Sequence, residues 1–263
     1  MTGALIFAFN NEKIDYLVMA RWNAQNILRH LGIPTAIVTD IDFAPQAHER
    51  VIFAKSASVN SRQFPDVGEV TWHNTTRVDA YTLSPWERTI VLDADYVVAS
   101  NQLQVLLEVD HEFLSHRWAY DVTGLNDFTG LNYFGNFNMP MHWATVMMFQ
   151  RCDHARLIFE AMNMIRDNWK HYRNLYKNPH SVYRNDHALS IALGIVNGHS
   201  SKHDSIPWRL ASLTPEHRLQ QLAPDRYRVD FVTPDKKPRW IELTQDFHAM
   251  GKQHLGDIVA NPC

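Results

Sequence analysis

The 263-residue sequence lacks the features that mark several specialised protein classes. It has only two cysteines, Cys152 and Cys263, so we expect no disulfide framework, and a reducing cytoplasmic compartment fits. No apolar run reaches the ~20 residues that a membrane-spanning helix needs. Residues 1–9 lack the basic start and long apolar stretch of a signal peptide. We therefore expect a cytoplasmic chain without a membrane segment.

A strong charge of one sign is also missing. The formal net charge is -3, so no global basic field exists to hold nucleic acid or an anionic membrane. Such a partner would need a local patch, and the candidates are the basic runs at 170–177 and 236–239. Each run is more often a solvated face. With 45% apolar and 20% charged residues, the composition is that of an ordinary globular protein.

The first hundred residues alternate between strand-like and helix-like patterns. Short apolar runs at 4–9 and 35–39 are typical of buried strands. Between them, residues 17–31 have apolar side chains at helical spacing, and Gly32 ends that helix. A strand, a helix and a strand joined by short connections imply two parallel strands with a right-handed crossover.

The rest of the chain continues this alternation less regularly. The pattern predicts further strands over 51–53, 89–92, 113–114, 120–123 and 145–149, and helices over 75–83, 152–172 and 185–193. We interpret 54–73 and the aromatic stretch 126–142 as irregular. We predict an α/β fold in a single domain over 1–263, with a Rossmann-like, mixed and mostly parallel sheet flanked by helices. In this prediction the second half adds elements to the same sheet.

The most informative stretch is Leu92-Asp93-Ala94-Asp95, directly after the apolar strand at 89–92. Burying two carboxylates there costs free energy unless a positive charge compensates. The carboxyl ends of strands form the ligand crevice of open α/β sheets, and residues 93 and 95 of an extended chain point to the same side. The pair is therefore a candidate site for Mg²⁺, Mn²⁺ or Ca²⁺. Alternatively, Asp93 caps a turn and Asp95 is solvated.

Residues 88–98, Arg-Thr-Ile-Val-Leu-Asp-Ala-Asp-Tyr-Val-Val, resemble the D-x-D region of nucleotide-sugar glycosyltransferases with the GT-A fold, and most closely the glycogenin-like retaining family. Further segments resemble that family in the same order: Arg77 in the preceding helix, residues 183–189, and His248-Ala249-Met250-Gly251-Lys252. The resemblance implies a GT-A fold and transfer of a sugar from a UDP-sugar, or a similar nucleotide-sugar, to an acceptor hydroxyl. It also implies a nucleotide-binding half over 1–100 and an acceptor and sugar half over 101–263.

The resemblance implies a metal site as well. Asp93, Asp95 and His248 would hold Mn²⁺ or Mg²⁺, and an imidazole among the ligands favours manganese over calcium. Lys252 would contact the diphosphate, and Arg77 would face the donor.

Three residues are the catalytic candidates: Arg77, Asn185 and Asp186. If the reaction retains configuration, as in the resembled family, Asn185 or Asp186 would steady the sugar. If it inverts configuration, a carboxylate base is required, and Asp186 is the candidate. A structural alternative for Asp186 is stabilisation by a helix N-terminus.

The remaining donor contacts are expected at the ends of the first two strands. Asp40 would accept hydrogen bonds from uracil or ribose, Asn10 would lie by the base, and Tyr16 would stack on it. Capping of a turn or of the first helix is the alternative for Asp40 and Asn10. The full set expected to bind the donor is Ala8, Phe9, Asn10, Tyr16, Asp40, Arg77, Asp93, Ala94, Asp95, Gly251 and Lys252.

The acceptor stays open between modified DNA, a saccharide, a protein and a small molecule. Residues 6–40 also resemble proteins encoded by tailed phages, which makes a hydroxymethylated DNA base in the host cytoplasm one candidate. The alternative functions are a sugar nucleotidyltransferase and a catalytically inactive nucleotide-sugar-binding protein. The former usually has a Gly-rich basic loop after its first strand, unlike Asn10-Asn11-Glu12-Lys13 here. The metal-ligand set counts against the latter.

Overall fold

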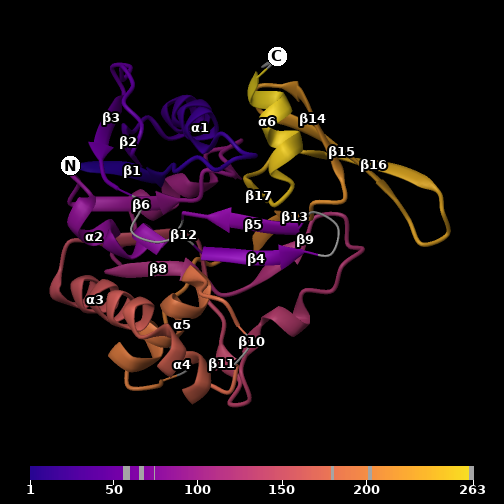
Figure 1. Ribbon diagram of the computed structural model, residues 1–263. Coiled ribbons are helices and arrows are strands. Elements are labelled where there is room, and N and C mark those ends of the chain that lie inside the picture. The colour runs from indigo at the N-terminus through magenta and orange to yellow at the C-terminus, as the bar shows by residue number, and fades with distance from the viewer. Residues whose placement is uncertain (56–59, 65–67, 74, 179–180, 201–202, 261–263) are drawn as a thin grey trace.

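The computed structural model describes residues 1–55, 60–64, 68–73, 75–178, 181–200 and 203–260. Within these ranges, no helix combines the length and the apolar character needed to cross a membrane. Figure 1 shows a central sheet with helices packed around it and a hairpin, β15–β16, that projects from the body.

The central sheet has six strands in the order β3-β2-β1-β6-β12-β8. Their bounds are β1 (Thr2–Phe7), β2 (Thr35–Thr39), β3 (Glu49–Phe53), β6 (Arg88–Leu92), β8 (Phe113–His116) and β12 (Trp143–Gln150). The first four strands in this order pair in parallel, and β12 runs antiparallel to both of its neighbours. Only β12 is therefore reversed, and the sheet is mostly parallel.

The helices lie between groups of strands along the chain. Their bounds are α1 (Tyr16–Leu31), η1 (Thr75–Asp79), α2 (Ala80–Leu83), η2 (Gln102–Leu107), η3 (Thr129–Leu131), α3 (Asp153–Asp167), α4 (Trp169–Leu175), α5 (Asn185–Val196) and α6 (Lys252–Ala260). α1 packs on β1 and β2, and α5 packs on β12 and α3. The predicted α/β fold class, with a mostly parallel sheet flanked by helices, is confirmed.

α1 begins and ends where local chemistry dictates. The Asp15 carboxylate accepts a hydrogen bond from the Val18 backbone N–H, and Gly32 closes the helix in the left-handed conformation at φ 68°. Gly3 in β1 is required for a different reason, because a Cβ there would lie 2.3 Å from the buried indole of Trp86. The capping residues therefore fix where α1 begins and ends, and Gly3 lets β1 pack closely against Trp86.

A second sheet forms beside the first, in the order β7-β17-β13-β9. Its strands are β7 (Tyr96–Val97), β9 (Ala119–Asp121), β13 (Leu210–Leu213) and β17 (Phe247–Ala249). Three further strands, β14 (Arg218–Ala223), β15 (Arg226–Val232) and β16 (Pro238–Leu243), make an antiparallel sheet of their own. The second half therefore adds β8 and β12 to the central sheet, as expected, whereas its other strands form separate sheets that the sequence prediction did not include.

Other differences from the sequence prediction are local. Residues 60–64 and 68–72, interpreted as irregular, form an antiparallel hairpin of β4 (Asn60–Phe64) and β5 (Gly68–Trp72), which local backbone pairing can build without an apolar pattern. Within 126–142, β10 (Tyr133–Phe134) and β11 (Met139–Pro140) also pair. The single helix predicted over 152–172 is interrupted at Asn168, which ends α3 and begins α4.

Candidate active site

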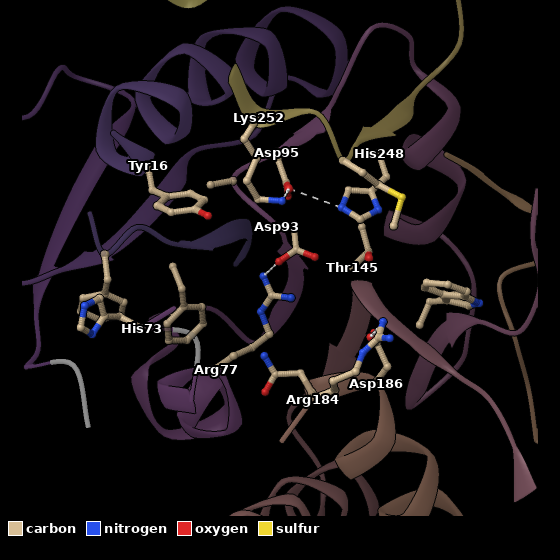
Figure 2. A pocket seen from close by; sticks show the side chains of 16 residues that line it. Tyr16, His73, Arg77, Asp93, Asp95, Thr145, Arg184, Asp186, His248 and Lys252 are labelled. Atoms are coloured by element: carbon tan, nitrogen blue, oxygen red, sulfur yellow. Dashed lines mark hydrogen bonds and ion pairs between the residues drawn. The ribbon is translucent and has the colours of Figure 1, made fainter. Parts of the chain in front are cut away.

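A solvent-open cleft lies where β1 and β6 end. Many of the residues expected to contact the donor, the metal or the sugar line this cleft. They are Phe9, Tyr16, Arg77, Asp93, Ala94, Asp95, Asn185, Asp186, His248 and Lys252. Figure 2 shows their side chains converging from several elements. Residues as far apart in the sequence as Phe9 and Lys252 therefore face one space.

The sequence prediction placed Asp93 and Asp95 on an extended strand. In the structure they lie in a tight turn. β6 ends at Leu92, and the Tyr96 N–H donates to the Asp93 carbonyl oxygen over 3.0 Å. The turn is anchored to the neighbouring strand because the Asp93 N–H donates to the Thr145 carbonyl oxygen over 2.9 Å. Both carboxylates still face the cleft, because a turn, like a strand, can direct two side chains toward the same space.

His248 reaches these carboxylates from the second sheet. It lies on β17 opposite Tyr96 of β7, and the Ala249 N–H donates to the Asp95 carbonyl oxygen over 2.9 Å. One ligand atom from each of Asp93, Asp95 and His248 lies within 4.8 Å of the others. The His248 Nδ1 is buried and has no hydrogen-bond partner among the described residues. Two carboxylates and an imidazole form a donor set that suits Mn²⁺ or Mg²⁺, so these residues fit a divalent cation.

Lys252, the first residue of α6, adds a positive charge to the same corner. Its ammonium lies 2.6 Å from Asp95 Oδ2, and His248 Nε2 lies 3.5 Å from that oxygen. Burial opposes ionisation of Asp95, but Lys252 and His248 together hold the pKa of this carboxyl well below its usual range. Burial likewise opposes the charge of Lys252, yet the neighbouring Asp95 raises its pKa.

Arg77 is buried beneath the cleft and connects Asp93 to the central sheet. Its guanidinium donates to the Ala144 carbonyl oxygen over 3.0 Å and to Asp93 Oδ1. Burial disfavours its charge, but Asp93 outweighs this and raises the pKa of Arg77. The guanidinium therefore stays charged at the base of the cleft.

Asp186 is held at the start of α5 by two donors. Its Oδ1 accepts from the Ala144 N–H over 2.9 Å, and its Oδ2 accepts from the Arg184 guanidinium over 2.8 Å. Burial works against the charge, but Arg184 and the Ala144 N–H lower the pKa of Asp186. Asn185 beside it accepts from the Tyr183 hydroxyl over 3.0 Å.

Among the titratable residues that line the cleft, Arg184 and His73 were missed by sequence reasoning; Phe7, Trp143, Thr145 and Met250 line it as well. Arg184 lines the cleft beside Asp186, and its place immediately before the candidate pair was a signal that could have found it. His73 lines the cleft from the residue after β5. Because that region was interpreted as irregular, no sequence signal pointed to His73.

Four residues expected to bind the donor do not line the cleft. Asn10 accepts from the Leu17 N–H over 3.0 Å and donates to Asp15 over 2.9 Å, which is the helix-capping role given as its alternative. Asp40 follows β2 and is exposed, whereas Ala8 is buried with its N–H on the Val38 carbonyl oxygen. Gly251 lies behind the cleft against Pro215.

The sequence matches no protein-family profile and no curated protein. Among solved structures, the glycosyltransferase GlyE of Streptococcus pneumoniae TIGR4 is similar, with a TM-score of 0.43 and 13% identity. The match covers 79% of this chain and 45% of that one, so the chain spans less than half the length of GlyE. The galactosyltransferase LgtC in complex with donor and acceptor sugar analogs gives a TM-score of 0.46 at 13% identity, over 74% of this chain and 70% of that one.

Mouse xyloside xylosyltransferase 1 is also similar, with a TM-score of 0.41 and 11% identity over 76% of this chain and 83% of that one. These likenesses are too distant to assign an activity.

Proposed function

We propose that this chain is a metal-dependent glycosyltransferase that moves a sugar from a nucleotide-sugar, with UDP as the nucleotide, to an acceptor hydroxyl, and that 1–263 forms one GT-A-like domain. The observation that carries the proposal is the convergence of Asp93, Asp95 and His248 in the same cleft as Lys252. Two of the ligands come from the turn after β6 and the third from β17, which pairs with β7 directly after that turn.

The charges of this corner suit a diphosphate leaving group. Breaking the sugar–phosphate bond concentrates negative charge on the departing nucleoside diphosphate, and a divalent cation held by the three ligands would stabilise that charge. Lys252 places an ammonium group in the same corner. It also begins α6, and the N-terminus of a helix carries a partial positive charge that favours phosphate.

The opposite end of the cleft suits the sugar. Asn185 and Asp186 line it, and the Arg184 guanidinium covers one oxygen of the Asp186 carboxylate. A carboxylate with a lowered pKa and two fixed donors is a poor proton acceptor but a good hydrogen-bond acceptor for sugar hydroxyls. This supports a steadying role for Asp186 and therefore favours retention over inversion.

The aromatic side chains of Phe9, Tyr16 and His73 line the cleft on the side of β1 and the β4–β5 hairpin. Figure 2 shows the Tyr16 hydroxyl directed toward the cleft and His73 at its far end. Flat rings around an open space can take a nucleobase by stacking. We assign this end to the base of the donor.

Hydrolysis of UDP-sugars with and without Mn²⁺, followed by mass spectrometry, tests the proposal. We expect Mn²⁺-dependent release of UDP from at least one donor and a loss of about 100- to 1000-fold in the Asp95→Asn variant, because the cation and its charge stabilisation are lost together. Asp225→Asn, on an exposed carboxylate between β14 and β15, is the matched control and should keep full activity.

No turnover with any UDP-sugar, or undiminished turnover by Asp95→Asn, would contradict the proposal. Formation of a nucleotide-sugar from a nucleoside triphosphate and a sugar phosphate would support the nucleotidyltransferase instead.

A further inference from the structure

The contact between Lys252 and Asp95 uses an oxygen that the metal site needs. The ammonium lies 2.6 Å from Asp95 Oδ2, and the same oxygen lies 3.5 Å from His248 Nε2 (Figure 2). Asp95 Oδ2 thus faces both the ammonium and the imidazole of the same candidate metal site. The lysine therefore binds the carboxylate where a cation shared with His248 would bind it.

We propose that Lys252 is a tethered competitor of the metal, which leaves Asp95 for the diphosphate when the donor binds, so that metal and nucleotide bind cooperatively. The inference rests on the proposed function, because it needs a cation at Asp95 and a diphosphate beside it. It assigns Lys252 a second contact besides the one with the donor.

Electrostatic repulsion prevents a divalent cation and the Lys252 ammonium from binding Asp95 at the same time. The side chain of Asp95 is 5% exposed and that of Lys252 is 25% exposed, so water screens their charges weakly. A divalent cation on Asp95 would repel an ammonium bound to the same carboxylate. Either the lysine excludes the cation or the cation displaces the lysine, and a diphosphate favours displacement because its oxygens give the ammonium a new partner.

The two basic residues that pair with the metal carboxylates differ in their freedom to move. Arg77 is fixed at a second point, because its guanidinium also donates to the Ala144 carbonyl oxygen over 3.0 Å. In the described part of the chain, the Lys252 ammonium forms its ion pair with Asp95 alone. Lysine also has a long, flexible stem. Lys252 can therefore exchange partners, whereas Arg77 stays on Asp93.

The backbone need not move for this exchange. α6 packs against α1 and β14, and its Leu255, Ile258 and Val259 side chains are buried. Lys252 is the first residue of this anchored helix, so rotation of its side chain is enough to carry the ammonium from Asp95 to a diphosphate in the cleft. The helix N-terminus would be next to that diphosphate.

Mn²⁺ binding measured by electron paramagnetic resonance, with and without UDP, tests the inference. For the wild type we expect weak Mn²⁺ binding alone and at least about tenfold tighter binding with UDP, and by reciprocity the same factor for UDP with Mn²⁺. In Lys252→Met, Mn²⁺ alone should bind about tenfold more tightly than in the wild type. The enhancement by UDP should fall by a similar factor.

Two further variants serve as controls. Lys252→Arg keeps the positive charge and should keep Mn²⁺ binding weak. Lys55→Met removes the charge of an exposed lysine after β3, outside the cleft, and should bind Mn²⁺ and UDP as the wild type does. If Lys252→Met folds poorly alone, its melting temperature gives the same information, because Mn²⁺ should raise it more than it raises that of the wild type.

The outcomes separate this inference from the proposed function. Equal Mn²⁺ affinity of the wild type and Lys252→Met without UDP, together with Mn²⁺-dependent hydrolysis of a UDP-sugar, overturns the inference and leaves the function standing. Absence of Mn²⁺ binding in every variant, with or without UDP, overturns both.

Discussion

The two ends of the cleft are built differently. At the sugar end, Asp186 binds the N–H of Ala144 in the central strand β12. At the metal end, Asp95, His248 and Lys252 come from a turn, a short strand of the second sheet and the start of α6. β17 pairs with β7 next to that turn, and the three side chains meet there through their charges.

This contrast indicates that the sugar end positions the sugar, whereas the metal end exchanges its ion pairs when ligands bind. A backbone hydrogen bond to a central strand fixes the sugar end before any ligand binds, which is what precise orientation of a reacting carbon requires. Side chains that neutralise one another can exchange partners when a cation or a diphosphate arrives. We therefore expect mutations at the sugar end to reduce turnover without changing metal affinity, and mutations at the metal end to change both.

Asp186→Asn should distinguish the sugar end from the metal end, because it should lower turnover and leave metal affinity unchanged. The amide keeps an oxygen for the Ala144 N–H but loses the charge that pairs with Arg184. We expect kcat for donor hydrolysis to fall by about 100-fold, since a charge-assisted contact to the sugar is lost. The Mn²⁺ affinity should stay within about twofold of wild type, because the metal ligands are untouched.

Steady-state kinetics and Mn²⁺ titration of the same Asp186→Asn preparation check this expectation. A large loss of Mn²⁺ affinity would show that the sugar end and the metal end form one coupled network and do not act separately.

A smaller effect concerns the scaffold behind the sugar end. The His142 N–H donates to Ser190 Oγ over 2.7 Å, and that hydroxyl donates to the Asp186 carbonyl oxygen over 2.6 Å. Burial, with help from His203 and Arg117, lowers the pKa of His142 to about 3 from its ordinary 6.5. The imidazole is therefore neutral in the folded protein and takes up a proton on unfolding below pH 6.5.

It follows that stability from His142 is present above pH 6.5 and is lost as the pH falls toward 3. A full proton difference is worth about 1.4 kcal/mol per pH unit. Between pH 6.5 and 5, urea unfolding of the wild type should therefore show about 1 to 2 kcal/mol more loss of stability than that of His142→Asn. The asparagine retains a polar group for Ser115, which lies 3.0 Å from the His142 Nδ1. Identical pH dependence of the two proteins would mean that His142 is charged or exposed in the folded state.

The sequence was most informative where a single segment carries its own pattern. The β-α-β unit at 4–39 and the strand before Asp93 could be predicted because apolar runs, helical spacing and Gly32 act locally. The convergence of His248 on Asp93 and Asp95 could be anticipated only through the family resemblance. Nothing within residues 247–249 indicates that they pair with Tyr96 and Val97 of β7.

The rest depended on tertiary contacts that leave no local trace. The Asn10 side chain caps the start of α1, and its expected place beside a base stays a prediction. His73 reaches the cleft because of how the β4–β5 hairpin is placed. The ion pair between Lys252 and Asp95, 157 positions apart in the sequence, depends on packing of α6 against α1 and β14.

The central claim is that one divalent cation binds between the turn after β6 and β17. A crystal structure with Mn²⁺ and UDP, with data collected at the manganese absorption edge, tests it most directly. We predict one strong anomalous peak within bonding distance of Asp93, Asp95 and His248, in contact with the diphosphate, and Lys252 turned from Asp95 toward a phosphate oxygen. UDP bound elsewhere, or a manganese peak away from these three side chains, would contradict the account.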